Sequence, residues 1–271
     1  MPRTDENDIR KKILEENRRV HALENRLYLK RHPEQTNFYQ ARLLNETLDT
    51  VDRHLGGREA RILELGCGTG YLHLPLLQRG HHVTGVDLSP EMIAVLQQNI
   101  PDGQKTRSQL VVMEAETFVE QDENTYDAVV MSALLHHLFD YRAVVKALCA
   151  KVKPGGLFLV FFEPLKQEID APLRYALHKA LANLDEYLYR RKMRALRIPL
   201  FEEDYELSDY QRRFGGIDPN LLAETLTQAD MRVVETKKYC ARRCGASAWI
   251  ANRILRTSNT FNLLARKTGG E

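Results

Sequence analysis

Cysteine is scarce in this chain, and its four cysteines do not form a metal-binding pattern. They are Cys67, Cys149, Cys240 and Cys244. Only Cys240 and Cys244 are close in the sequence, and a single C-x-x-x-C lacks the second pair of ligands that a structural zinc site needs. We therefore expect free thiols in a reducing compartment and no metal site.

Long hydrophobic runs and an excess of one charge are also missing. No apolar stretch reaches the ~18 residues that a membrane-spanning helix needs. The N-terminal stretch Met1–Arg19 is polar and charged, which does not fit a signal peptide. The chain has 39 basic and 37 acidic residues and a formal net charge of +2, so acidic and neutral partners both stay open. The expectation is a cytoplasmic protein, with no signature of an oligomeric state.

A glycine-rich turn between an apolar run and a helix is the most informative feature present. Arg61–Leu65 reads R-I-L-E-L, which predicts a buried strand, and the chain continues G-C-G-T-G-Y. Glycine at alternate positions lets the backbone approach a ligand without a Cβ clash. A helix is predicted over Tyr71–Arg79 and a strand over Val83–Val86, with Asp87 at its carboxyl end. An acidic residue about 20 positions after a glycine loop commonly holds ribose hydroxyls.

The spacing of the glycines distinguishes between cofactors. Dinucleotide-binding turns carry G-x-G-x-x-G, whereas this turn carries G-x-G-x-G, with Tyr71 in the place of the third dinucleotide glycine. The lysine of a phosphate-binding G-x-x-x-x-G-K-[ST] loop is also missing. E-L-G-C-G-T-G, with V-D-L-S downstream, resembles the class I S-adenosylmethionine (SAM)-dependent methyltransferases, in their small-molecule (type 11/12-like) branch. The resemblance covers Arg61 to Lys166 and fades in the C-terminal part.

Strands and helices alternate after the glycine turn, which indicates a parallel sheet. Further strands are predicted near Leu110–Met113, Ala128–Met131 and Leu157–Phe162. Lys153–Gly156 (K-P-G-G) is predicted as a break before the last of them. The resemblance implies an α/β fold with a Rossmann-like, seven-stranded, mostly parallel sheet flanked by helices and ending in an antiparallel pair.

Helical segments precede this core, and two insertions interrupt its C-terminal part. Residues 1–57 are predicted as a helical cap over the cofactor end of the sheet, and residues 58–271 as the SAM-binding domain. Residues 165–216 are predicted as a helical lid inserted after the fifth strand, because apolar residues recur at helical spacing from Leu173 to Leu188. Residues 240–259 form a second insertion.

The resemblance assigns residues to SAM and to its product S-adenosylhomocysteine (SAH). Asp87 would hold the ribose, Glu64 would face the methionine amino group, and Glu114 with Ala115 would lie next to the adenine. The alternative for both glutamates is a role as surface carboxylates. The full predicted cofactor set is Glu64, Gly66, Cys67, Gly68, Gly70, Asp87, Leu88, Met92, Glu114, Ala115, Ser132 and Leu134.

Three side chains near the same edge are candidates for a general base, namely His136, His137 and Glu163. Imidazole titrates near neutral pH, and Glu163 ends the fifth strand at the carboxyl edge, where open α/β sheets bind ligands. A base is needed only if the acceptor is a hydroxyl or an acidic carbon. Alternatively, one histidine only fixes the loop, and Glu163 is a loop hydrogen-bond acceptor.

Aromatic residues of the cap and the lid are candidates for binding the acceptor, with ordinary packing as the alternative. They are Tyr39, Tyr175, His178 and Tyr187. Basic residues from Arg190 to Arg197 and in the C-terminal part permit an anionic or lipid-like acceptor, although such clusters also occur on solvated helix faces.

The sequence therefore predicts a methyltransferase that moves the SAM methyl group to an O, N or C atom of a small-molecule acceptor. Its main contribution would be to align the two reactants. One alternative is an RNA methyltransferase, which we disfavour because the fourth strand ends in S-A-L-L rather than the N-P-P-Y of base-methylating relatives. Another alternative is a non-catalytic scaffold that binds SAM.

Overall fold

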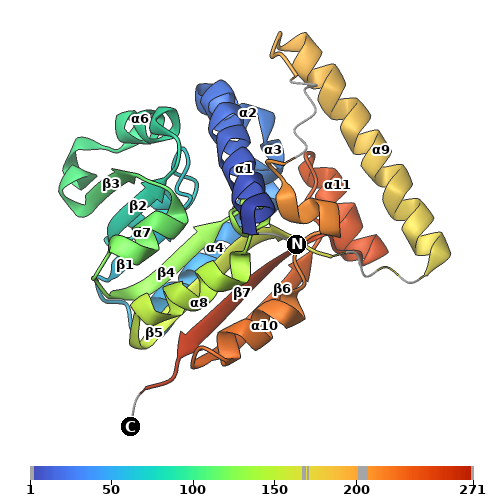
Figure 1. Ribbon diagram of the computed structural model, residues 1–271. Helices are drawn as coiled ribbons and strands as arrows, with labels where there is room; N and C mark the ends of the chain where they lie inside the picture. The colour runs from blue at the N-terminus through green and yellow to red at the C-terminus, as the bar shows by residue number, and fades with distance from the viewer. Residues whose placement is uncertain (1–2, 167–168, 170, 201–206, 270–271) are drawn as a thin grey trace.

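The computed structural model describes residues 3–166, 169, 171–200 and 207–269 and folds them around one seven-stranded sheet (Figure 1). The strands are β1 (Arg61–Leu65), β2 (His82–Asp87), β3 (Ser108–Val112), β4 (Tyr126–Ser132), β5 (Val152–Pro164), β6 (Met231–Tyr239) and β7 (Thr260–Lys267). Their order is β3-β2-β1-β4-β5-β7-β6. Strands β1 to β5 pair in parallel, and β7 runs antiparallel to both β5 and β6. The predicted Rossmann-like sheet is confirmed, including its antiparallel end.

The helices fall into three groups. Those before the sheet are α1 (Arg3–Glu24), α2 (Tyr28–Arg31), α3 (Pro33–Thr36) and α4 (Phe38–His54). Those that alternate with the strands are α5 (His73–Gln78), α6 (Pro90–Asn99), α7 (Ala115–Gln121), α8 (Tyr141–Lys151) and α10 (Pro219–Thr227). The insertions contribute α9 (Pro172–Ala195) and α11 (Gly245–Ile250), which continues into the π-helical turn η5 (Ala251–Leu255). Short 3₁₀ turns are η1 (Asn25–Leu27), η2 (Asp102–Arg107), η3 (Leu135–His137) and η4 (Tyr210–Phe214).

Both faces of the sheet are covered, because successive residues of a strand point to opposite sides. In β1, Leu63 and Leu65 belong to the core beneath α7, α8 and α10. Ile62, directly before Leu63, belongs to the other core, beneath α4, α5 and α6. Burial of these residues on both faces holds the strand rigidly, so the turn that follows it is fixed in place at the carboxyl edge.

The predicted break at Lys153–Gly156 is an irregularity inside β5 and not a separate turn. Tyr126 pairs with Val152 and Ala128 pairs with Leu157, so β5 carries extra residues opposite β4. Gly155 has a φ of +74°, and a Cβ at Gly156 would lie 2.8 Å from the Asp127 carbonyl oxygen. The K-P-G-G segment does interrupt the regular register, as predicted, but β4 and β5 pair on both sides of it.

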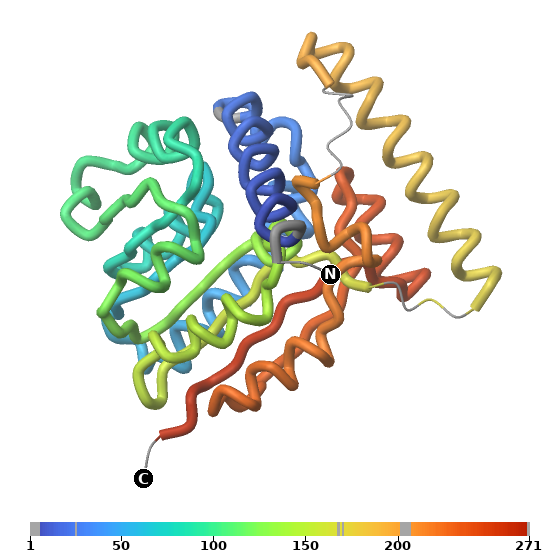
Figure 2. The backbone as a smooth tube through the Cα atoms, in the orientation of Figure 1, coloured from blue at the N-terminus to red at the C-terminus, as the bar shows by residue number. Residues whose placement is uncertain are grey.

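Helix α9 lies in the insertion that was predicted as a lid after the fifth strand. It stands at the side of the molecule, next to α11 (Figures 1 and 2). Its inward face carries His178, Asp185, Tyr189 and Met193. The stripe that predicted the helix faces solvent instead, with Leu173 74% and Leu184 52% exposed. Both series follow helical spacing, so periodicity predicted the helix but could not tell which face would pack.

The ends of the insertion at residues 165–216 meet beside β5. Leu165 and Ile217 form an isolated bridge, and the backbone amide of Ile217 donates to the Pro164 carbonyl at 2.8 Å. The insertion therefore leaves and rejoins the core at one place. In the part of the chain that the structure describes, α9 and the other helices are all too short or too polar to cross a membrane.

Candidate functional site

Two neighbouring cavities open at the carboxyl edge of the sheet. The first, here called the edge cavity, is lined by Asn17 and His21 of α1, Gly66–Thr69 after β1, Asp87 and Leu88 at the end of β2, Glu114–Glu116 after β3, and Ser132–Leu134 after β4. The second, here called the side chamber, has a volume of about 370 Å³ and lies between α1, α2, α3, α9 and the loop after β4. Five residues line both cavities, namely His21, Tyr28, Gln35, Ala133 and His137.

The glycine loop brings bare backbone to the edge cavity. Gly66 and Gly68 have φ values of +67° and +50°, in the left-handed region that favours glycine. A Cβ at Gly66 would lie 2.9 Å from a side-chain carbon of Leu134. Gly70, with a φ of +101°, does not line the cavity, and its missing Cβ makes room for Leu96 at 2.6 Å. Glycine is therefore needed at these positions for two different reasons.

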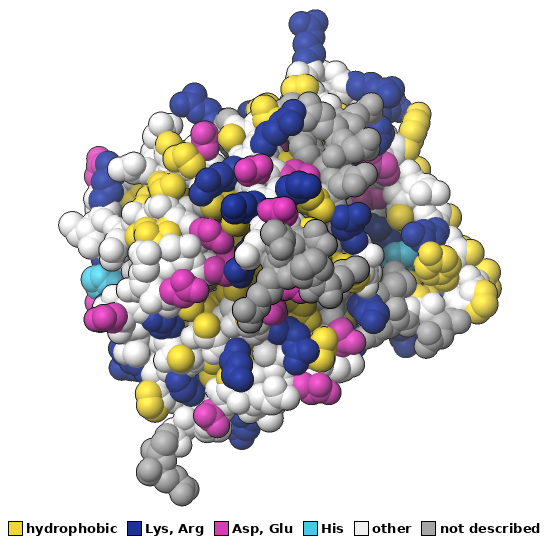
Figure 3. Space-filling model, viewed as in Figure 1, with side chains coloured by type: hydrophobic (Ala, Val, Ile, Leu, Met, Phe, Trp, Pro, Cys, Tyr) yellow, Lys and Arg dark blue, Asp and Glu magenta, His cyan; other side chains and the backbone are white. Residues whose placement is uncertain are grey.

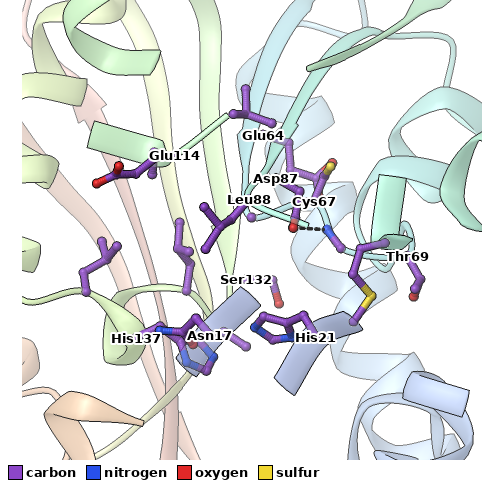
Figure 4. Close-up of a pocket in the computed structure, with 18 of the residues that line it drawn as sticks. Asn17, His21, Glu64, Cys67, Thr69, Asp87, Leu88, Glu114, Ser132 and His137 are labelled. Carbon is purple, nitrogen blue, oxygen red and sulfur yellow. Dashed lines mark hydrogen bonds between the residues drawn. The ribbon is translucent and has the colours of Figure 1, made fainter. Parts of the chain in front are cut away.

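Asp87 ties the glycine loop to the next helix. One carboxylate oxygen accepts a hydrogen bond from the Gly68 amide at 2.8 Å, drawn in Figure 4, and the other accepts from the Ser89 amide at 2.9 Å. Ser89 caps α6 by accepting from the Met92 amide. Asp87 thus supports the loop and leaves the capping of α6 to Ser89, while it still lines the edge cavity.

Polar atoms without partners are concentrated around the edge cavity. Within the described residues, these buried atoms have no hydrogen-bond partner: Oδ1 of Asn17, Nδ1 of His21, Oε1 of Gln35, Oγ1 of Thr69, Oε2 of Glu116 and Oγ of Ser132. Buried polar groups are hydrogen-bonded in the great majority of cases, and an unsatisfied one costs about 1–3 kcal/mol. The edge cavity is therefore built to receive a ligand that carries several hydrogen-bonding groups.

The structure brings the residues assigned to the cofactor together, with one exception. All of them except Gly70 line the edge cavity. Glu64 is 1% exposed, and its carboxylate lies 2.9 Å from Nδ1 of His73. Burial raises the pKa of Glu64, while His73 lowers it. One oxygen of Glu64 is therefore occupied within the fold. Asn17, His21 and Gln35 were missed, since no motif distinguishes them in the sequence, and Thr69 was missed although it lies within the glycine-rich turn.

Glu163 holds the loop after β4 and does not project into either cavity. It is fully buried, and its carboxylate accepts from the backbone amides of Leu134, Leu135 and His136 at 2.7, 2.8 and 3.3 Å. It also lies 2.9 Å from Nδ1 of His136. Both carboxylate oxygens are thus occupied. This geometry favours the role of Glu163 as a hydrogen-bond acceptor over its predicted role as a base.

The two histidines of the loop have different surroundings. His136 is 4% exposed, with Nδ1 at Glu163 and Nε2 3.5 Å from Asp209. His137 lines both cavities, and its Nδ1 donates to the Ser208 carbonyl. Burial, together with nearby His136, holds the pKa of His137 well below its usual value. His137 is therefore the better placed of the two for contact with a ligand.

A cluster of His136, His137 and Asp209 has ligand atoms within 4.8 Å of one another. The geometry would allow a metal ion, which the sequence did not predict. However, Nδ1 of His136 already contacts Glu163, and Nδ1 of His137 already contacts the Ser208 carbonyl. These hydrogen bonds hold the loop after β4 in place.

The residues predicted to bind the acceptor do not line the side chamber, nor do they line the edge cavity. Tyr175 and Tyr187 point to solvent, 39% and 62% exposed. His178 is buried between α9 and η5, with Nδ1 2.9 Å from the Thr257 hydroxyl. Tyr39 belongs to α4. Tyr189 lines the side chamber instead, and its hydroxyl donates to the Arg31 carbonyl at 3.0 Å.

Several basic residues expected to form an anion-binding rim have acidic or aromatic partners. Arg243 lies 3.7 Å above the Tyr189 ring and 2.8 Å from Glu186. Lys237 pairs with Glu46 at 3.0 Å. On the face shown in Figure 3, basic and acidic side chains are mixed and do not form a separate positive patch. Because Arg243 and Lys237 already have partners within the protein, their contacts do not point to a particular anionic ligand.

His32, in the wall of the side chamber, gives a testable pH dependence. Burial lowers its pKa, but hydrogen bonds with Glu24 and Glu34 outweigh burial and raise the pKa to about 9. A raised pKa adds stability below the unfolded value of about 6.5, and this stability is lost as pH rises through the folded value.

We expect the wild-type protein to lose on the order of 2 kcal/mol of unfolding free energy between these pH values, and His32→Gln to lose much less. Urea unfolding at a series of pH values across this range measures the unfolding free energy of the wild-type protein and of His32→Gln. His82→Gln, whose ring is half exposed, is the control and should behave as the wild type. The same pH dependence in His32→Gln would contradict the assignment.

Comparisons with known sequences point to one family. A family model described as a methyltransferase domain matches residues 63–160. The ubiquinone biosynthesis O-methyltransferase of Aromatoleum aromaticum is 35% identical over 127 residues, which cover 46% of this chain and 53% of the relative. The enzyme of the same name from Burkholderia ambifaria is 32% identical over 184 residues, 68% of each chain. The chain spans about half the length of most such relatives.

Solved structures show the same fold at low sequence identity. Magnesium protoporphyrin IX methyltransferase from Synechocystis PCC 6803, with bound SAH, matches with a TM-score of 0.54 and 15% identity, covering 93% of this chain and 100% of the other. The [4+2]-cyclase SpnF matches with a TM-score of 0.56 and 17% identity, covering 84% and 81%. At these identities the likeness concerns the fold alone.

Proposed function

Because the chain belongs to the class I SAM-dependent methyltransferase family, we propose that it transfers the methyl group of SAM to a small-molecule acceptor. The observation that carries the proposal is the pair of cavities with a common wall. The edge cavity has unsatisfied polar atoms suited to a polar cofactor, and the side chamber adjoins it at His21, Tyr28 and His137. Two ligands held there would meet at that wall.

The residues of the edge cavity fit SAM in chemical terms. Asp87 would accept from the ribose hydroxyls, and the bare backbone at Gly66 and Gly68 would lie against the methionine part. Glu114 and Ala115 would flank the adenine. When bound, SAM supplies a methyl group on a sulfonium, which is a good leaving group. The task left to the protein is to align the acceptor and to exclude water.

The side chamber supports a compact, polar acceptor. Its walls come from the cap at residues 1–57, from the insertion at residues 165–216 and from the loop after β4, so the acceptor would be enclosed within one chain. Many of the lining residues are charged, among them Glu24, Glu34 and Asp209. Burying a hydrocarbon tail against charged groups is unfavourable. We therefore favour a polar acceptor over a lipid-like one, and over RNA.

The experiment combines methyl-labelled SAM, the purified protein and a cell extract divided into polar, lipid and RNA fractions. Label should enter the polar fraction with the wild-type protein and with Asp102→Ala, which changes a 95% exposed carboxylate. Label should be lost with Asp87→Ala. Label in the lipid or RNA fraction would refute the polar class of acceptor. SAH binding without label in any fraction would instead support a non-catalytic scaffold.

A further inference from the structure

Helix α1 places a histidine at the meeting point of the two cavities. Asn17 and His21 lie one turn apart on α1, and both line the edge cavity. His21 also lines the side chamber. Figure 4 shows His21 and His137 entering the cavity from different elements, α1 and the loop after β4. The cap therefore contributes a titratable group where cofactor and acceptor would meet.

One ring nitrogen of His21 has no protein partner. Its Nδ1 is buried and makes no hydrogen bond to any described residue. The nearest rings are those of His137, with centroids 5.5 Å apart at 76°, and Tyr28, at 6.3 Å. His137 differs, because a carbonyl oxygen only accepts, so its Nδ1 carries the proton donated to Ser208. His21 thus carries a buried ring nitrogen that has no partner in the described part of the chain.

The charges around His21 leave it neutral near neutral pH. Burial lowers its pKa, as do His32 and His136, while Asp87 at the end of β2 and Glu24 on α1 act in the opposite direction. The net pKa lies below the usual histidine value. Neighbouring His137 is also held neutral by burial. A neutral imidazole has the lone pair that a proton acceptor needs.

We propose that His21 is the general base of the reaction and that the acceptor is a hydroxyl compound, an inference that rests on the proposed methyl transfer. The hydroxyl oxygen bonds to the transferred methyl carbon while the carbon–sulfur bond breaks with its electron pair on sulfur. The hydroxyl proton passes to His21, which becomes imidazolium and releases the proton to water after the product leaves. A neutral amine acceptor would need no base at this step.

Two of the other candidates for this role, Glu163 and His136, are engaged with each other. Glu163 and Nδ1 of His136 contact each other, and Glu163 also accepts from three backbone amides. His137 remains at the same junction and would orient the hydroxyl group. Its contact with Ser208 holds its ring in place, whereas the unpartnered Nδ1 makes His21 the stronger candidate for taking the proton.

The test uses 4-nitrocatechol as a hydroxyl probe whose anion absorbs in the visible. The protein is first saturated with sinefungin, a SAM analogue with a cationic amine in place of the methyl sulfonium. At a pH below the probe's own pKa, adding the wild-type protein should raise the anion band. His21→Gln should reduce that rise ~10-fold or more, since each pKa unit changes the anion ratio about tenfold. His82→Gln should match the wild type.

Two further readouts separate the possible failures. Calorimetry with each variant sets a sinefungin concentration that saturates it, so a weaker cofactor site in His21→Gln cannot be mistaken for a lost base. The histidine NMR signal that disappears in His21→Gln should shift when the probe is added to the wild-type protein. No anion band with the wild-type protein, or an equal band with His21→Gln, would overturn the role of His21. Failure of the wild-type protein to bind SAH would overturn the proposed function itself.

Discussion

Asp87→Ala should weaken SAH binding by at least ~100-fold. The carboxylate would lose its bonds to the ribose hydroxyls, and hydrogen bonds to charged groups contribute about 1.5–3 kcal/mol each. Two such bonds correspond to about 3 kcal/mol, or roughly two orders of magnitude in affinity. The substitution also releases the Gly68 and Ser89 amides, which Asp87 holds at 2.8 and 2.9 Å. Asp87→Ala therefore removes both the support of the glycine loop and the contact with the ribose.

Calorimetric titration with SAH measures the loss, and the thermal midpoint checks that the variant is folded. Asp87→Asn keeps one oxygen as an acceptor for a backbone amide, so we expect an intermediate affinity. Asp102→Ala, on an exposed turn, should bind as the wild type does. If Asp87→Ala bound SAH within threefold of the wild type, the assignment of Asp87 to the ribose would be wrong.

Glu163→Ala should destabilise the protein by about 4 kcal/mol, one of the larger effects expected of a single substitution. Removing this carboxylate leaves three backbone amides of the loop after β4 without their acceptor. Each such group costs about 1–3 kcal/mol. For a chain of this size the loss corresponds to a drop of ~10 °C in the unfolding midpoint.

Urea unfolding and thermal melting measure this effect, with the exposed Glu120→Ala as the control. Glu163→Gln separates structure from catalysis, because the amide still offers one acceptor oxygen but cannot take a proton from a substrate. We expect Glu163→Gln to lose less stability than Glu163→Ala and to keep a measurable part of the methyl transfer. Full stability with complete loss of transfer would restore Glu163 as the base.

Local patterns in the sequence were sufficient where a short segment carries its own constraint. The apolar run of β1, the positive φ angles at Gly66 and Gly68, and Asp87 at the end of β2 depend on neighbouring residues alone. Consequently, the sheet could be predicted, and all but one of the residues assigned to the cofactor line a single cavity. The spacing of three glycines even separated this turn from a dinucleotide-binding turn, since the third glycine position is a matter of local packing.

Contacts between distant segments were not predictable in the same way. His21 lies more than a hundred residues from His137, and nothing in the polar helix around it distinguishes it from the other charged residues of α1. The orientation of α9 likewise depends on contacts between segments that are distant in the sequence. Asp185 accepts from the amides of Arg243 and Cys244, and these long-range bonds help to hold the face with fewer leucines against the protein.

The sequence by itself determined the sheet, the glycine loop and the kind of cofactor, because strand burial and turn geometry are set by residues a few positions apart. Only the tertiary structure decided which side chains meet at the junction of the two cavities. It assigned Glu163 to the loop, turned Tyr175 and Tyr187 to solvent and brought His21 into the site. The physical reason is that a buried polar group is defined by its partners, and those partners come from elements far apart in the chain.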